Sequence, residues 1–89
     1  MKKKDNNSIK IVGAENCENC KKFEKRIFDY LLKCNLSIDI EKMDCLSDKS
    51  IDLSCKYDIN SIPFAIYQTR YLIFSNQMNE SDIKMFIQG

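Results

Sequence analysis

The fold of this 89-residue chain is decided by the stretch Ile9-Lys10-Ile11-Val12-Gly13-Ala14-Glu15-Asn16-Cys17-Glu18-Asn19-Cys20. Its first five residues are the apolar, β-rich run of a buried strand, and an amphipathic helical pattern begins directly after its two cysteines. Two thiols at the start of a helix can exchange with a disulfide, or they can clamp a soft metal ion. Other features of the sequence are needed to distinguish disulfide exchange from metal binding.

Length and charge limit the classes of function. A chain of 89 residues makes one domain with a single modest core. A net charge of +1 gives no global field that would recruit nucleic acid or an anionic membrane. Lys2-Lys3-Lys4 is followed by polar residues rather than by an apolar segment, so it is not expected to be a secretory signal peptide. The sequence also contains no run of about 18 apolar residues, the length that a membrane-spanning helix needs. We therefore expect a cytoplasmic protein with a flexible N-terminus at residues 1–8 and one domain at residues 9–89.

The cysteine and histidine counts narrow the chemistry further. The chain has five cysteines, an odd number, at spacings that do not form the disulfide framework of a secreted protein. It has no histidine, which excludes Cys-His nucleophiles, zinc sites with histidine ligands and histidine proton switches. The reactive groups of this protein are therefore expected to be its cysteine thiols.

Periodicity predicts an α/β protein with the order β-α-β-α-β-β-α. After the first strand, an apolar stripe predicts a helix over Glu18–Lys33, and alternation from Leu36 to Ile40 predicts a second strand. The two strands should be parallel, because a right-handed crossover joins them through the helix. A four-stranded mixed sheet flanked by helices follows. The later elements are a helix capped by Ser47 that runs to Tyr57, a hairpin of Phe64–Tyr67 and Tyr71–Phe74, and a last helix that starts near Asn79.

The two clustered thiols have unequal positions on the predicted helix. Cys17 falls at or before the first turn, where free N–H groups and the helix dipole favour a thiolate. Cys20 lies three residues later on the same face, within the reach of a disulfide and more shielded. Glu18 opposes the thiolate form of Cys17, whereas Lys21 and Lys22 favour it. We therefore expect the two sulfurs to have different roles.

Ile62-Pro63 is the second informative element. Proline cannot donate a hydrogen bond to a sheet ladder, so Pro63 belongs at the first residue of a strand. An X-Pro bond also tolerates the cis form better than other peptide bonds do. A lone proline at a strand start is usually only a turn residue, but here it accompanies a CxxC motif.

Together, three stretches resemble the small thioredoxin-like redox-active disulfide proteins, which are glutaredoxin-sized members of the thioredoxin superfamily. They are residues 9–13, residues 17–24 and residues 56–66. The resemblance implies that residues 9–89 form a thioredoxin-like domain, with Cys17 as the catalytic thiol and Cys20 as the resolving thiol.

The same resemblance implies a binding surface and a set of partners. Pro63 would be cis and packed against the disulfide, and the backbone at Ile62 would bind the extended chain of a partner. The expected protein is a monomeric thiol-disulfide oxidoreductase that needs no cofactor and holds no metal. Its partners would be a disulfide-containing protein substrate and an upstream reductase, with no nucleic acid and no membrane.

Several residues depart from the patterns of the larger families. Asn16 stands where thioredoxins carry Trp, and Glu18-Asn19 replaces their Gly-Pro, which argues against a general-purpose thioredoxin. Ile62 stands where Thr or Val is common. Residues 75–78, Ser-Asn-Gln-Met, lack the glycine pair that glutaredoxins keep for glutathione, so glutathione is not expected as the cosubstrate.

Two other classes of function compete with redox exchange. A Cu(I)-type metallochaperone of the ferredoxin-like βαββαβ fold also has CxxC between its first strand and first helix. Such loops usually carry Met two residues before the first cysteine, where this chain has Glu15, and they need no proline at a strand start. The third class is an interaction module in which the thiols are incidental.

The other three cysteines have simpler interpretations. Cys34 continues the apolar stripe of the first helix, and Cys55 lies beside apolar residues of the short second helix, so both are expected in the core. Cys45 is predicted in an exposed loop, where it could act as an extra redox thiol or crosslink a dimer. The spacings between these cysteines provide no second tight pair for a four-cysteine zinc or iron-sulfur site.

Overall fold

The computed structural model of the chain describes residues 8–89 and has the element order β-α-β-α-β-β-α, as the sequence predicts. Residues 1–7 of the predicted flexible N-terminus lie outside the described residues, whereas Ser8, its last residue, is the first residue of β1. None of the helices in the described part of the chain is long and apolar enough to cross a membrane. The elements are β1 (Ser8–Gly13), α1 (Glu18–Lys33), β2 (Asp39–Asp44), α2 (Asp48–Tyr57), β3 (Phe64–Tyr67), β4 (Arg70–Ile73) and α3 (Glu80–Gln88).

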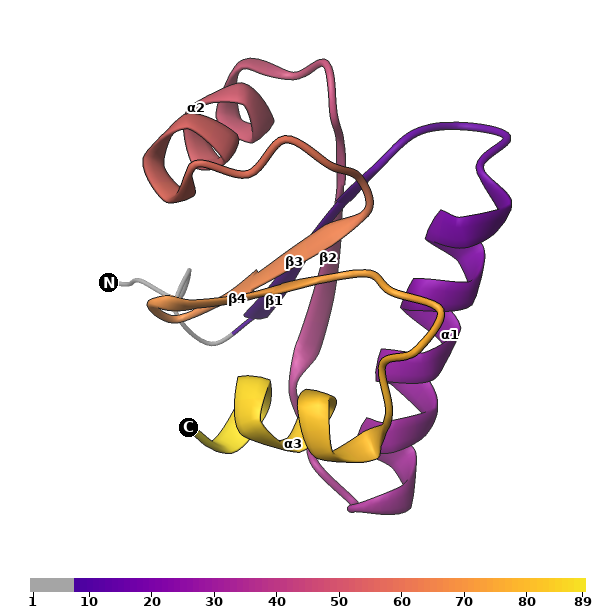
Figure 1. Cartoon of the computed structure of the whole chain (residues 1–89). Coiled ribbons are helices and arrows are strands. Elements are labelled where there is room, and N and C mark those ends of the chain that lie inside the picture. The colour runs from indigo at the N-terminus through magenta and orange to yellow at the C-terminus, as the bar shows by residue number, and fades with distance from the viewer. Residues whose placement is uncertain (1–7) are drawn as a thin grey trace.

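The strands form one mixed sheet in the order β2-β1-β3-β4 (Figure 1). β1 and β2 are parallel and joined through α1, with Val12 opposite Met43. β3 is antiparallel to both of its neighbours, so that Ile66 faces Lys10 of β1 and Tyr71 of β4. The predicted four-stranded mixed sheet is thus confirmed, and its two inner strands, β1 and β3, meet at the centre.

Helices cover both faces of this sheet, with α1 and α3 on one side and α2 on the other (Figure 1). Side chains alternate accordingly along β1, since Ile9 and Ile11 pack in the core under α1 and α3, whereas Val12 packs on the face of α2. All four residues of β3 are buried. A strand buried on both faces explains the continuous apolar sequence of residues 64–67.

Helix α1 has the bounds that its apolar stripe predicts, Glu18–Lys33. Phe23, Ile27, Tyr30 and Leu31 are buried against the sheet. Cys34, in contrast, is an exposed cysteine, so its predicted place in the core is wrong. The physical reason is that Cys34 is the C-cap, where the backbone leaves the helical conformation and the side chain leaves the stripe.

The end of α1 also explains why the second strand starts later than predicted. Asn35 adopts a left-handed conformation with φ of 56°, its N–H donates to the carbonyl of Leu32, and the N–H of Leu36 donates to that of Leu31. These two bonds make a Schellman motif, and Leu36 packs against the core cluster that includes Leu31. Leu36 is therefore used to close the helix, and β2 begins only at Asp39.

The two shorter helices begin where their capping residues predict. The Ser47 side chain accepts a hydrogen bond from the N–H of Ser50 at the start of α2. Asn79 and Asp82 form a reciprocal capping box at the start of α3. Each cap satisfies backbone donors that the first turn of a helix leaves free, which fixes where the helix starts.

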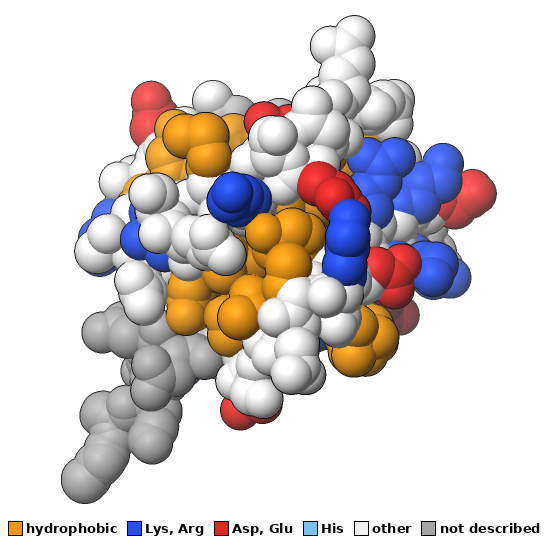
Figure 2. Space-filling model, turned by 90° about the horizontal axis from the view of Figure 1, so that it is seen from below, with side chains coloured by type: hydrophobic (Ala, Val, Ile, Leu, Met, Phe, Trp, Pro, Cys, Tyr) orange, Lys and Arg blue, Asp and Glu red, His pale blue; other side chains and the backbone are white. Residues whose placement is uncertain are grey.

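The face that contains α3 and the end of α1 carries a patch of apolar side chains. Seen from below the view of Figure 1, hydrophobic groups gather near the middle of the surface, beside basic and acidic groups (Figure 2). Leu32 of α1 and Met85 of α3 are among the exposed apolar residues.

Lys33 and Glu80 join the two helices through an ion pair of 2.8 Å, which raises the pKa of Lys33. Both side chains are more than half exposed, so this pair adds little stability.

The β3–β4 hairpin is tied to α3 by one arginine. The turn is tighter than predicted, because Gln68 takes the left-handed conformation with φ of 58° and β4 already starts at Arg70. The Arg70 guanidinium donates to the carbonyl oxygens of Phe86 at 2.6 Å and Ile87 at 2.7 Å, near the end of α3. It also lies 5.6 Å from the ring centroid of Tyr67. Arg70 thus satisfies carbonyls that the end of a helix leaves free.

The first testable prediction concerns this contact. Arg70→Lys is expected to lower the free energy of unfolding by about 1–2 kcal/mol, because an ammonium group cannot donate in the same fork to two carbonyls. Urea unfolding followed by circular dichroism measures the loss. Lys84→Met, on the exposed side of α3, is the control, and an equal loss in both variants would contradict the assigned role of Arg70.

Candidate redox site at the start of α1

Cys17 and Cys20 are joined by a disulfide at the N-terminus of α1. Their Cα atoms are 5.2 Å apart, a usual separation for bridged cysteines. Cys17 is the N-cap of the helix, and its sulfur accepts a hydrogen bond of 3.1 Å from the N–H of Cys20. Any negative charge that develops on the sulfur of Cys17 is therefore stabilised by a backbone donor and by the helix dipole.

The loop before the disulfide has a special backbone conformation. Asn16 has a φ of 56°, in the left-handed region that asparagine tolerates better than most side chains do. This residue turns the chain from the end of β1 into the N-cap at Cys17. The left-handed backbone gives a local structural reason for an asparagine at this position, where thioredoxins carry tryptophan. The sequence alone did not predict this conformation.

Gly13, the last residue of β1, lies directly against the disulfide. A Cβ atom placed on Gly13 would lie 2.8 Å from the sulfur of Cys20, closer than real side chains approach, and 4.0 Å from the Cβ of Pro63. The lack of a side chain at Gly13 therefore lets the helix start pack on the strand end. This residue was predicted only as the end of a strand, because its contact with Cys20 depends on tertiary structure.

Pro63, which follows Ile62, lies near the same glycine position. Pro63 is fully buried, the Ile62–Pro63 peptide bond is cis, and the N–H of Phe74 donates to the carbonyl of Pro63 at 3.1 Å. Ile62 itself is 45% exposed. The structure thus gathers the cysteine pair and Pro63 around Gly13, with an exposed apolar side chain at the edge of the site.

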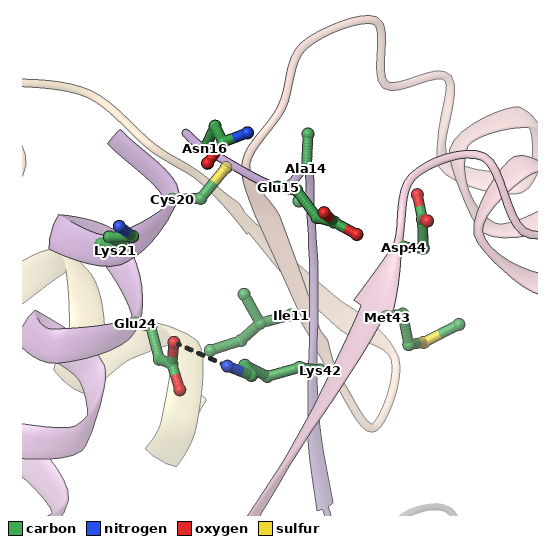
Figure 3. A pocket seen from close by; sticks show the side chains of 11 residues that line it. Ile11, Ala14, Glu15, Asn16, Cys20, Lys21, Glu24, Lys42, Met43 and Asp44 are labelled. Atoms are coloured by element: carbon green, nitrogen blue, oxygen red, sulfur yellow. Dashed lines mark ion pairs between the residues drawn. The ribbon is translucent and has the colours of Figure 1, made fainter. Parts of the chain in front are cut away.

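A groove opens on one side of the disulfide, between α1 and the ends of β1 and β2 (Figure 3). Its volume is about 340 Å³, and Cys20 lines it whereas Cys17 does not. Glu24 and Lys42 form an ion pair of 3.7 Å across the groove. Both cysteines are half-buried, and they differ in that only Cys20 lines the groove.

The observed fold bears on the metal-binding alternative. The ferredoxin-like metallochaperones have the order βαββαβ, whereas this chain has β-α-β-α-β-β-α. The metallochaperone alternative is therefore not favoured. Within residues 8–89 there is no group of three or more His, Cys, Asp or Glu side chains arranged to hold a metal ion.

Two of the remaining cysteines are exposed, contrary to prediction. Cys55 lies on α2, which buries only Ser50 completely, so the apolar neighbours of Cys55 in sequence do not cover it. The exposed Cys34 forms a hydrogen bond with the side chain of Tyr30 one turn earlier, and this bond, together with burial, raises the pKa of Tyr30. Both predictions of core positions were wrong.

Cys45 is half-buried rather than exposed. Its side chain packs against the core on the face of α2, and its N–H donates to the carbonyl of Gly13 at 2.8 Å. The backbone of Cys45 thereby continues the pairing of β2 with β1 up to the strand end that contacts the disulfide. This arrangement favours a structural role for Cys45 over that of an accessible redox thiol.

Comparison with known proteins supports the fold assignment. Thioredoxin 1 from the thermophilic eubacterium Thermosipho africanus matches with a TM-score of 0.56 and 16% identity over 91% of this chain and 90% of that one. An uncharacterized thioredoxin-like protein from Clostridium perfringens matches with a TM-score of 0.64 and 18% identity over 93% and 71%. The reduced Schistosoma mansoni thioredoxin pre-protein matches with a TM-score of 0.53 and 25% identity over 93% and 83%.

Sequence comparison adds no closer relationship. No protein-family model matches the chain, and a search of curated proteins finds no match. The resemblance predicted from sequence is nevertheless confirmed at the level of structure. The chain has a thioredoxin-like fold with a CxxC disulfide at the start of its first helix.

Proposed function

We propose that the protein is a thiol-disulfide oxidoreductase that reduces or exchanges disulfides in a protein partner. The observation that carries this proposal is the Cys17–Cys20 disulfide, whose first sulfur is the N-cap of α1. A thioredoxin-like fold with a CxxC disulfide supports thiol-disulfide exchange in general. The protein partner and the roles of the two sulfurs are the specific parts of the proposal.

In the proposed mechanism the thiolate of Cys17 attacks one sulfur of the substrate disulfide. A mixed disulfide forms and the first substrate thiolate leaves. The thiolate of Cys20 then attacks the sulfur of Cys17, so that the second substrate thiolate leaves and the Cys17–Cys20 disulfide forms. Two electrons pass from the protein dithiol to the substrate, and the substrate thiolates take up the protons that the two cysteines lost.

The positions of the two sulfurs support this division of roles. The hydrogen bond from the N–H of Cys20 and the dipole of α1 favour negative charge on Cys17. Cys20 lies within the first turn of the helix, already at bridging distance, so the resolving step is intramolecular. The short lifetime of a mixed disulfide follows from this proximity.

Ile62 and Pro63 form the proposed docking surface for the substrate chain. Pro63 is buried and its carbonyl accepts a hydrogen bond from the N–H of Phe74, the residue after β4, whereas the neighbouring Ile62 has an exposed apolar side chain. An extended substrate segment could bind along the backbone at Ile62 and bring its disulfide to Cys17. An upstream reductase, a cytoplasmic location and a monomeric state complete the proposal.

The role of each sulfur can be tested by substitution. Cys17→Ser is expected to abolish dithiothreitol-driven reduction of a protein disulfide, since no thiolate remains at the N-cap. Cys20→Ser is expected to accumulate a mixed disulfide with the partner, which mass spectrometry after trapping from cell extract identifies. Cys55→Ser removes an exposed thiol elsewhere and is the control. Full activity in Cys17→Ser would refute the assigned roles.

Gly13 is the subject of a third prediction. Gly13→Ala is expected to destabilise the oxidised protein by about 1–3 kcal/mol, because the added methyl overlaps the sulfur of Cys20 while the disulfide holds that sulfur in place. The reduced protein should lose less, since the free thiol can rotate away. Urea unfolding of both redox forms measures the difference, with Ala14→Ser as control. Equal losses in the two forms would show that the contact is not specific to the disulfide.

The docking surface gives a fourth prediction. Ile62→Asp is expected to reduce kcat/KM for a protein disulfide about tenfold, through loss of an apolar contact and the cost of desolvating a charge under the substrate chain. Reduction of a small aromatic disulfide should change less than twofold under the same conditions. Leu32→Asp places the same charge at an exposed apolar position on the far end of α1 and serves as control. Equal effects of Ile62→Asp on both substrates would contradict docking at Ile62.

A further inference from the structure

Strand β4 forms one edge of the sheet, and its outer side is apolar. No strand of the described part of the chain lies beyond it (Figure 1). Tyr71 is 50% exposed and Ile73 is 38% exposed. Both side chains lie on the α2 face of the sheet, opposite Ile66 and Phe64 of β3, and the Tyr71 ring centroid is 5.8 Å from that of Tyr57. An exposed apolar edge strand is a template for pairing with another chain.

The backbone of β4 directs hydrogen-bonding groups to the same outer side. The N–H of Phe74, directly after β4, donates to the carbonyl of Pro63, directly before β3. In an antiparallel pair, residues that bond to the neighbouring strand alternate with residues whose N–H and C=O groups point away from it. Leu72 therefore bonds to β3, whereas the N–H and C=O groups of Tyr71 and Ile73 point out of the sheet. These two residues present both apolar side chains and backbone groups to a further strand.

The opposite edge of the sheet, β2, has a different character. Its exposed residues are all charged, namely Asp39, Glu41, Lys42 and Asp44. Charges on an edge strand oppose pairing, because a second strand would have to desolvate them. β4 carries one charged residue, Arg70, and its guanidinium is bound to carbonyls of α3. Of the two edges, β4 is therefore the one that favours pairing.

We propose that β4 pairs with β4 of a second copy of this chain, antiparallel and across a twofold axis. An axis at Leu72 places Tyr71 of each copy opposite Ile73 of the other. Because both residues direct their backbone groups outward, each such pair can exchange both of its N–H···O=C bonds. This inference goes beyond the proposed redox function, and it replaces the monomeric state proposed with it.

The register makes the strand complementary to itself. An aromatic ring opposite a β-branched side chain is a favourable cross-strand pair, and the axis at Leu72 provides this pair twice. A charge near a twofold axis would meet the same charge on the other copy, but residues 71–74, Tyr-Leu-Ile-Phe, carry none. A twofold contact uses the same edge of both copies, so the charged β2 edges remain outside and pairing stops at two chains. These features favour a second copy over a strand of a different protein.

The first test is sedimentation equilibrium of the reduced protein over a range of concentrations. Reduction is required because the exposed Cys34 and Cys55 could otherwise join two copies through a disulfide. A particle of two chains is expected to become dominant as the concentration rises, whatever the redox activity. A mass of one chain at every concentration up to about 1 mM would overturn the proposal, since weaker association is not a specific interface.

Amide hydrogen exchange of the unmodified protein then locates the contact. The N–H groups of Tyr71 and Ile73 are expected to exchange about fivefold more slowly where the dimer dominates, because they become hydrogen-bonded. The N–H of Lys49, in the first turn of α2, has no acceptor one turn earlier in the helix and should exchange at an unchanged rate. A dimer that leaves exchange at Tyr71 and Ile73 unchanged is joined by another surface and would refute pairing through β4.

Charge variants test the register. Tyr71→Lys and Ile73→Glu each place a charge on the edge and are expected to raise the dissociation constant of the dimer about tenfold. Combining them places each new lysine opposite a new glutamate of the other copy, so the double variant should bind about threefold more tightly than either single variant at low salt. Leu46→Lys adds a charge at an exposed apolar residue between β2 and α2 and is the control.

Circular dichroism checks that each variant is folded, and amide exchange of the unmodified protein tests the contact without any substitution. A loss of dimer in Leu46→Lys equal to that in Tyr71→Lys would contradict the assigned edge. A double variant that binds no more tightly than the single variants would overturn the register centred on Leu72, and with it the proposal.

Discussion

The site depends on the close approach between Gly13 and the sulfur of Cys20. At this point the end of β1 meets the first turn of α1 with no side chain between them, and a single Cβ atom would come within 2.8 Å of the sulfur. The approach fixes the start of α1, which places Cys17 at the N-cap. It also leaves Pro63 at contact distance from the same glycine position. One residue without a side chain thus brings three segments of the chain together.

A series of contacts holds the proline side of the site in place. β3 is buried on both faces, so the strand that follows Pro63 cannot move without exposing apolar surface from both cores. Phe74, the residue after β4, donates its N–H to the carbonyl of Pro63, and Arg70 at the start of β4 binds carbonyls near the end of α3. The hairpin is therefore fixed at both ends, and only Ile62 remains exposed at the site.

The sequence predicted most of the fold because its signals were local and agreed with one another. The apolar stripe gave α1 its bounds, and Ser47 and Asn79 marked the starts of α2 and α3. The errors arose where periodicity was applied beyond the end of a helix. Cys34 fits the stripe by spacing but is the C-cap, and Leu36 fits a strand but closes the Schellman motif.

Features that depend on packing between distant segments could not be predicted in the same way. The contact of Gly13 with Cys20 and the groove beside that sulfur are formed by side chains or strand ends from different elements. Helix position predicted that Cys20 would be more shielded than Cys17; both are half-buried, and the difference in shielding stays a prediction. The two cysteines do differ in their neighbours, since the sulfur of Cys17 accepts a backbone hydrogen bond and Cys20 lines the groove. The two sulfurs of one disulfide therefore have different surroundings, which only the tertiary structure sets.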